Sequence, residues 1–322
     1  MKKVLAVMVA FFAFACFLPA ANAAGWYWLS SDAKYTKEFD PSSVVVTKAK
    51  NVNGKSIATE IMVWTRTAYS YEGAKETIKG YDNMGNVIKK PENLAYSLAQ
   101  AVINPQERTL YYKQEIFYNQ KGEPIYNRDK GRVKEINSQS FDEAFYASAV
   151  DEVFRMGEMA RCKAKDRWIT LWTAPVAKET VTVTADTTTF RLRGDNLIFW
   201  EWEEHKDLNN KITEIRFQKK RINIKTQAVQ LVSGRVWTDK KGWSNISDPY
   251  EGRYHKIDAT SPALKGAERL VAYAKGYSVW VNRYRTDLPQ ENKQESAKTA
   301  EKPAAPVTAN QSKGKPQISV KK

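Results

Sequence analysis

Two short stretches of this chain share one pattern that indicates its fold: DPSSV at 40–44 and DTTTF at 186–190. In each, an aspartate is followed by hydroxyl residues and then by an apolar residue. Tryptophans recur at matching places before and after these stretches: Trp28, Trp64, Trp168 and Trp200. Because motifs that recur in one order indicate an internal repeat, we expect two copies of one unit in tandem.

Later landmarks recur as well. Ile136 and Ser140 are repeated as Ile257 and Ser261 at one common offset. Ser140 with Glu143 three residues later is typical of a capping box at a helix start, and Ser261 is followed by Pro262, which suits a first helical turn. Apolar residues follow each serine at helical spacing: Phe141, Ala144, Phe145, Ala149, Val153 and Phe154 in the first copy, and Leu264, Ala267, Leu270, Val271 and Ala274 in the second. Each unit is therefore predicted to close with an amphipathic helix.

The rest of each unit has the composition of β-strands. Segments 43–47, 57–67, 109–118 and 222–232 are rich in β-branched and aromatic residues. Gly122 and Gly234 are each expected in a hairpin turn, and a further helix is expected at 71–78. The predicted fold class is α+β: two tandem modules, each a mainly antiparallel β-sheet packed against a C-terminal α-helix.

The ends of the chain differ from its middle. Residues 1–23 have a positive start, an apolar run and small residues before Ala24, as in a signal peptide; a lipoprotein signal at Cys16 fits less well. Residues 286–322 are rich in Pro, Ala and Lys, which predicts a disordered tail.

The modules are placed at 24–160 and 164–285. We expect export to the periplasm, the cell surface or the medium, with no transmembrane segment in the mature chain. Cleavage leaves one thiol, Cys162, either an inert residue or a homodimer cross-link.

Together, several of these features resemble a known family. They are the Trp-rich opening, the Asp-x-(Ser/Thr)-(Ser/Thr) motif, the strand ending in Trp, the Gly hairpin, the Ile-x-x-x-Ser helix start and the stretch NLAYSL at 93–98. The chain resembles two tandem copies of the surface-adhesin protein E-like domain of bacterial envelope proteins. The resemblance implies a sheet packed on a helix, adherence to host matrix or plasma proteins, no catalytic residue and no cofactor. The tandem arrangement and the tail depart from the minimal family unit, so host binding need not accompany the fold.

The sequence contains little that indicates a catalytic or metal-binding site. The chain has only 2 His and 2 Cys, which excludes Cys–His metal clusters and most His-based nucleophiles. Glu201, Glu203 and Glu204 beside His205 are the best metal-binding candidates, but alternation along a strand would put Glu204 on the other face. We interpret this stretch as the solvated end of a strand and expect no enzyme, metal or cofactor. A carbohydrate-active enzyme remains the third alternative, because 36 acidic residues make some carboxylate pair inevitable.

The aromatic and basic residues are the best candidates for binding. Recurrence in both copies favours core positions for Trp28, Trp64, Trp168 and Trp200. Four tryptophans lack that explanation and are candidates for an exposed patch: Trp26, Trp202, Trp237 and Trp243. The net charge of +15 and the cluster Lys219, Lys220 and Arg221 indicate attraction to polyanions.

Outside the cell those polyanions are sulfated glycans, lipopolysaccharide or wall polymers rather than nucleic acid. The leading hypothesis is therefore adhesin-like, non-catalytic binding of a host matrix protein or an anionic polymer. The alternative is a periplasmic or wall-associated structural protein.

Overall fold

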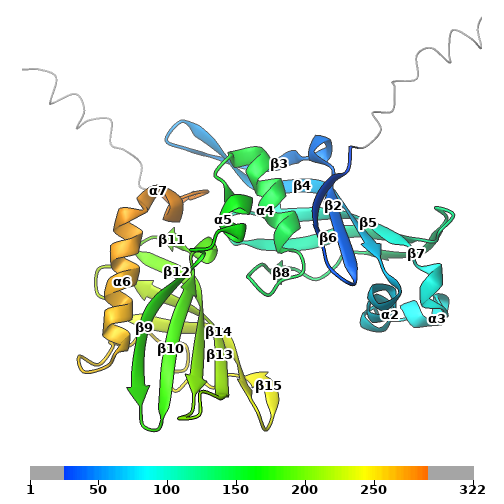
Figure 1. Cartoon of the computed structure of the whole chain (residues 1–322). Coiled ribbons are helices and arrows are strands. Elements are labelled where there is room, and N and C mark those ends of the chain that lie inside the picture. The colour runs from blue at the N-terminus through cyan, green and yellow to red at the C-terminus, as the bar shows by residue number, and fades with distance from the viewer. Residues whose placement is uncertain (1–24, 289–322) are drawn as a thin grey trace, which may run out of the picture. The chain divides into compact units, whose positions relative to one another are not determined.

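The computed structural model describes residues 25–288 (Figure 1), and its first sheet holds eight antiparallel strands. Their bounds are β1 (Tyr27–Ser31), β2 (Tyr35–Phe39), β3 (Val45–Val52), β4 (Lys55–Tyr69), β5 (Tyr96–Asn104), β6 (Thr109–Tyr118), β7 (Pro124–Asp129) and β8 (Lys134–Glu135). The strand order is β1-β2-β4-β5-β6-β7, with β3 pairing with β4 and β8 with β6.

The second sheet repeats this topology with seven strands. They are β9 (Trp168–Val176), β10 (Glu179–Asp186), β11 (Arg191–Arg193), β12 (Asn196–Lys206), β13 (Ile212–Asn223), β14 (Val229–Thr238) and β15 (Gly242–Asn245). Their order is β9-β10-β12-β13-β14-β15, and β11 pairs with β12 as β3 pairs with β4. The predicted fold class of two tandem antiparallel modules is confirmed.

The aspartate motifs that predict the repeat build the same local structure in both modules. Each starts a 3-10 turn, η1 (Pro41–Ser43) and η3 (Thr187–Thr189). Asp40 Oδ1 accepts hydrogen bonds from the backbone N–H of Ser42 at 2.9 Å and from its hydroxyl at 2.6 Å. The corresponding bonds from Thr188 to Asp186 Oδ1 are 3.0 and 2.7 Å long.

The last hydroxyl of each motif then ties the turn to the long central strand. The Ser43 hydroxyl accepts from the Trp64 backbone N–H, and the Thr189 hydroxyl accepts from that of Trp200, both at 2.9 Å. The hydroxyl residues are therefore needed because each satisfies backbone groups that the turn leaves unpaired.

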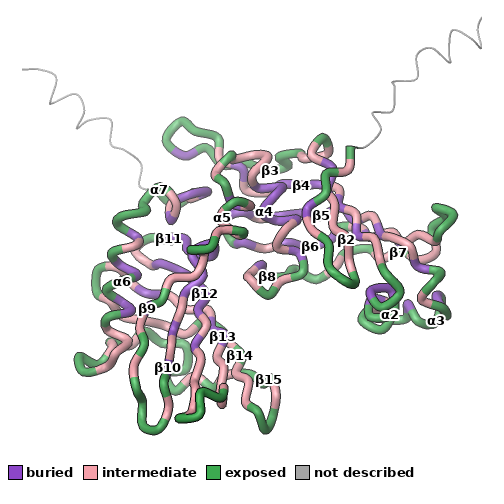
Figure 2. Tube along the Cα trace, viewed as in Figure 1, coloured by how far each residue is buried: buried purple, intermediate pink, exposed green. Residues whose placement is uncertain are grey.

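A helix packs on each sheet, as expected. Helix α4 (Glu143–Phe154) contributes Phe145, Tyr146 and Val150 to the first core, and α6 (Ala263–Gly276) contributes Ala267, Leu270 and Ala274 to the second. The buried stretches of the strands in Figure 2 mark these cores. The other helices are α2 (Tyr71–Gly80), α3 (Met84–Val87), η2 (Pro91–Asn93), α5 (Glu158–Lys163) and α7 (Ser278–Val281). The helix expected at 71–78 is thus present as α2, in a segment between β4 and β5 that the second module lacks.

The helix starts differ from the prediction. Asp142 occupies the N-cap position of α4 without a side-chain cap bond, so the predicted capping box at Ser140 is wrong. The Ser140 hydroxyl instead accepts from the backbone N–H of Asn137 at 2.9 Å, and Glu143 pairs with Arg108 and Arg167. In the second module the Ser261 hydroxyl accepts from the Ala263 N–H at 3.3 Å, while Pro262 takes the N-cap position.

The predicted strand 222–232 is also wrong, because a turn separates β13 from β14. The Asn223 side chain accepts from the backbone N–H groups of Lys225 and Thr226, and Gln227 has a φ of 58°. Gly234 consequently lies inside β14, and Gly242, with a φ of 65°, occupies the hairpin position that corresponds to Gly122. The turn was missed because it contains neither Gly nor Pro.

A buried ionic cluster surrounds Glu158 of α5, whose side chain is 0% exposed. Its carboxylate accepts from Arg108 at 2.5 Å, from Arg283 Nε at 2.9 Å and from the Tyr284 hydroxyl at 3.1 Å. Both arginines also donate to the Thr188 carbonyl, at 3.0 and 2.5 Å. Burial opposes the charged carboxylate, but Arg283 and Arg108 outweigh it and lower the pKa of Glu158.

The predicted signal peptide at 1–23 and nearly all of the predicted tail at 286–322 lie outside the described residues. Within residues 25–288, none of the helices combines the length and the apolar character that a bilayer crossing requires.

Candidate functional site

Most of the predicted binding residues lie on one face of the second sheet. Trp202 is paired with Phe217 across β12 and β13, and Trp237 with Trp243 across β14 and β15. Because side chains alternate along a strand, Lys219 and Arg221 share this face, whereas Lys220 lies on the opposite face with Glu201. Trp26 is half-buried in the first module, apart from the others. The predicted cluster of three cations is therefore divided between the two faces.

The shared face carries a layered group of aromatic rings that we call the aromatic face: Trp200, Trp202, Phe217, Trp237 and Trp243. Trp200 stacks on Phe217 with ring centroids 4.5 Å apart, and both are buried. Trp202 lies 5.9 Å from Phe217 and 6.3 Å from Trp243, which is 42% exposed. Trp202 and Trp243 thus form an outer layer on a buried base.

Cations adjoin this outer layer. The exposed Arg235 guanidinium lies 5.5 Å from the centroid of the Trp243 ring, and Lys240 and Lys241 are exposed in the turn that leads to β15. Within residues 25–288, no ion pair engages these three cations. Lys219 differs, because Glu135 of β8 holds its ammonium at 2.8 Å and also accepts from the Trp200 indole.

The tryptophans expected in the core have mixed positions. Trp200 is buried, and Trp64 and Trp168 are half-buried. Trp28 is 57% exposed, so its predicted core position is wrong. Its indole N–H donates to Ser31 at 2.8 Å on β1, which is an edge strand of the sheet in the described part of the chain.

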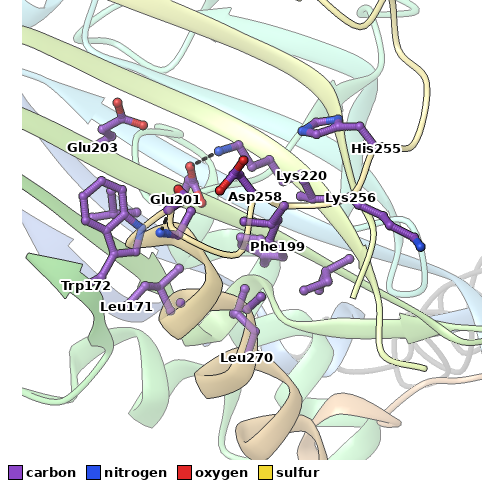
Figure 3. A pocket seen from close by; sticks show the side chains of 18 of the residues that line it. Leu171, Trp172, Phe199, Glu201, Glu203, Lys220, His255, Lys256, Asp258 and Leu270 are labelled. Carbon is purple, nitrogen blue, oxygen red and sulfur yellow. Dashed lines mark hydrogen bonds and ion pairs between the residues drawn. The ribbon is translucent and has the colours of Figure 1, made fainter. Parts of the chain in front are cut away.

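The opposite face of the second sheet holds a pocket of about 310 Å³ (Figure 3). Its floor is formed by Phe199, Glu201 and Glu203 of β12 together with Lys220 of β13. Helix α6 forms one wall and the loop before it forms another, where Tyr250 stacks on His255 with centroids 3.5 Å apart. Gly266 allows α6 to approach β9, because a Cβ there would lie 2.8 Å from the Trp172 ring.

The acidic residues of the pocket floor are buried, which corrects the expectation of a solvated strand end. Glu201 and Glu203 are 4% and 9% exposed. Alternation places both on the α6 side of the sheet, where the loop before α6 closes over them. Glu201 pairs with Lys220, and burial raises the pKa of Glu201.

Glu203 is held by a different set of partners. His205 Nε2 lies 2.8 Å from Glu203, and Arg216 lies 3.3 Å from the same carboxylate oxygen. Burial works against its charge, but the His205 hydrogen bond and the nearby cations prevail and lower the pKa of Glu203. In return, the hydrogen bond to Glu203 raises the pKa of His205. Among the described residues, no group of three or more His, Cys, Asp or Glu side chains is placed to hold a metal ion.

His255 and Cys162 are two further residues whose side chains could take part in chemistry. His255 is half-buried, and within residues 25–288 its Nδ1 is buried without a hydrogen-bond partner. Cys162 is a free thiol packed against the first core, and burial raises its pKa to about 12. A thiol with so high a pKa reacts slowly, because the thiolate is the reactive form.

Sequence reasoning missed the pocket as a whole, since its lining comes from β9, β12, β13, the loop before α6 and α6 itself. One local signal was present: Leu197, Phe199, Glu201 and Glu203 alternate on one strand face and turn from apolar to acidic. No protein-family model matches the chain, and comparison with the curated proteins and with the solved structures finds no match either.

Proposed function

We propose that this chain is an exported, non-catalytic binding protein that takes an anionic polysaccharide on its aromatic face, in keeping with the adhesin-like resemblance. The observation that carries the proposal is the pair Trp202 and Trp243, which meet edge to face, with Trp202 against buried Phe217 and Arg235 beside Trp243. Aromatic side chains in such a layer usually pack into a hydrophobic core. Here α6 covers the other side of the sheet, which leaves these rings available to a partner.

The chemistry of the face suits a charged glycan. Tryptophan rings offer large, rigid contact areas to the apolar faces of sugar rings, and exposed cations attract sulfate, phosphate or carboxylate groups along a polymer. Threonine hydroxyls extend the same face over β9 and β10, where Thr173 and Thr182 lie 3.3 Å apart. The face therefore combines aromatic, hydrogen-bonding and cationic groups over six strands.

A solid-phase assay tests this proposal with heparin and with a purified anionic wall polymer, each at 0.15 and 0.5 M salt. We expect retention at the lower salt concentration that falls at the higher one, because salt screens exposed charges. Trp243→Ala and Arg235→Gln should each weaken retention at least tenfold. Trp28→Ala is the matched control, since Trp28 is an exposed tryptophan on the first module. Equal loss in all three variants, or no retention of the wild type on either polymer, would refute the proposal.

Two further measurements separate the remaining alternatives. Binding to immobilised matrix proteins that depends on Trp243 would identify a protein ligand in place of the glycan. Antibody staining of intact cells tests surface exposure, and staining only after permeabilisation would favour a periplasmic or wall-associated role.

A further inference from the structure

We infer that the pocket under α6 binds a small organic cation, an amine with a short apolar body, with the ammonium group at Glu201 and the body against α6. This inference concerns the opposite face of the sheet and does not depend on the aromatic face. It rests on the size, lining and charge of the pocket.

The walls suit an apolar body. Leu171, Trp172 and Phe199 contribute from the sheet, and Leu270 contributes from α6. Figure 3 shows Phe199 and Leu270 on one side of the space, below the polar groups. A volume of about 310 Å³ is at the lower end for ligand pockets, so a compact ligand fits better than a long acyl chain.

The polar end of the pocket selects a cation. Glu201, Glu203 and Asp258 line it, against Lys220 and Lys256. Lys256 is exposed, and Figure 3 shows its ammonium directed away from Glu201. Lys220 is bound to Glu201 already. Among the described lining residues, an entering anion would therefore meet three carboxylates, while the ammonium of Lys256 points away from Glu201 (Figure 3).

Glu201 is the group best placed to receive an ammonium. Within residues 25–288, the Glu201 carboxylate accepts a hydrogen bond from Lys220 through Oε1. Its second oxygen, Oε2, is therefore available to another donor. Burial raises the pKa of Glu201 even beside Lys220, which means that one ammonium does not fully offset the cost of burying this charge. The rings of Tyr250 and His255 near the entrance add aromatic surface that favours cations.

A set of probes with one hydrocarbon body and three head groups tests the inference by calorimetry on the full chain at pH 7.5. The probes are hexylammonium, hexan-1-ol and hexanoate. We expect hexylammonium to bind at least tenfold more tightly than hexan-1-ol and hexanoate not to bind. Tighter binding of hexanoate, or no binding of hexylammonium, overturns the inference.

Two pocket variants and one control variant locate the site. Glu201→Gln should weaken hexylammonium binding at least tenfold, whereas Glu204→Gln, on the other face of β12, should leave it unchanged. Ala263→Trp fills the pocket from the first turn of α6 without altering any charge, and it should also abolish binding, so the inference remains testable if Glu201→Gln unfolds. Unchanged binding in Ala263→Trp would place the amine elsewhere. Both pocket variants should keep heparin retention, which separates this inference from the proposed function.

Discussion

Replacing Glu158 by Gln should destabilise the protein strongly. The side chain is fully buried and faces two arginines, Arg108 at 2.5 Å and Arg283 at 2.9 Å. The amide keeps the shape of the carboxylate and can still accept a hydrogen bond, but it carries no charge. Arg283 would then remain buried without its counter-ion, and Arg108 would keep only its pair with Glu143.

The size of the effect follows from that loss. Removing one partner of a buried ion pair costs about 3–5 kcal/mol, and the retained amide oxygen favours the lower limit. At about 2–4 °C per kcal/mol for a chain of this length, a loss of about 3 kcal/mol lowers Tm by roughly 6–12 °C.

Urea unfolding, followed by tryptophan fluorescence and far-UV circular dichroism, measures the change. Glu152→Gln is the matched control, because Glu152 pairs with Arg155 on the surface of the neighbouring helix α4, where ion pairs contribute little. An unfolding midpoint for Glu158→Gln equal to that of the control would refute the structural role of the cluster.

The same cluster predicts a pH dependence with a definite sign. The pKa of Glu158 is lowered in the folded protein from its ordinary value of 4.5. Its contribution to stability is therefore complete above that value and is lost as the pH falls through the folded pKa. The difference between wild type and Glu158→Gln should be constant near neutral pH and should narrow in acid, and a constant difference down to pH 3 would contradict the assignment.

Three further predictions concern packing and turns. Gly73→Ala should destabilise by about 1–3 kcal/mol, despite the better helix propensity of Ala, because its Cβ would lie 2.2 Å from the Lys34 carbonyl oxygen; a raised Tm would contradict the close approach. Leu270→Ala should cost about 2–5 kcal/mol in urea unfolding, since it removes a buried side chain between α6 and the sheet, and a smaller loss would mean that the core collapses to fill the space. Ser140→Ala should cost about 1 kcal/mol through the bond from Asn137 while leaving the helical circular dichroism signal unchanged, and a loss of helicity would restore the predicted cap.

Much of the fold could be predicted because residues close together in the sequence determine its turns and strands. The aspartate motifs satisfy their own turns within three residues, so the same residues produce the same structure wherever the repeat occurs. The strands predicted at 57–67 and 109–118 correspond to β4 and β6. They could be predicted because their composition alone favours a pleated, half-buried surface. The turn after Asn223 escaped prediction because it is made by a side chain and a positive φ at Gln227, which composition does not mark.

The candidate sites divide in the same way. Aromatic residues outside the repeat could be proposed from the sequence, since Trp202, Trp237 and Trp243 have no counterpart in the first copy. These tryptophans meet on one face because of the pairing register of four strands. Lys220 lies on the opposite face from Lys219 and Arg221 because side chains alternate along a pleated strand.

The repeat, the β-rich character and the supply of aromatic and basic residues follow from the sequence, because turns and alternation are encoded within a few neighbouring residues. The enclosure of Glu158 by arginines from distant segments and the position of Glu201 in a pocket depend on tertiary packing. Burial is a property of what folds over a residue, and long-range packing sets it.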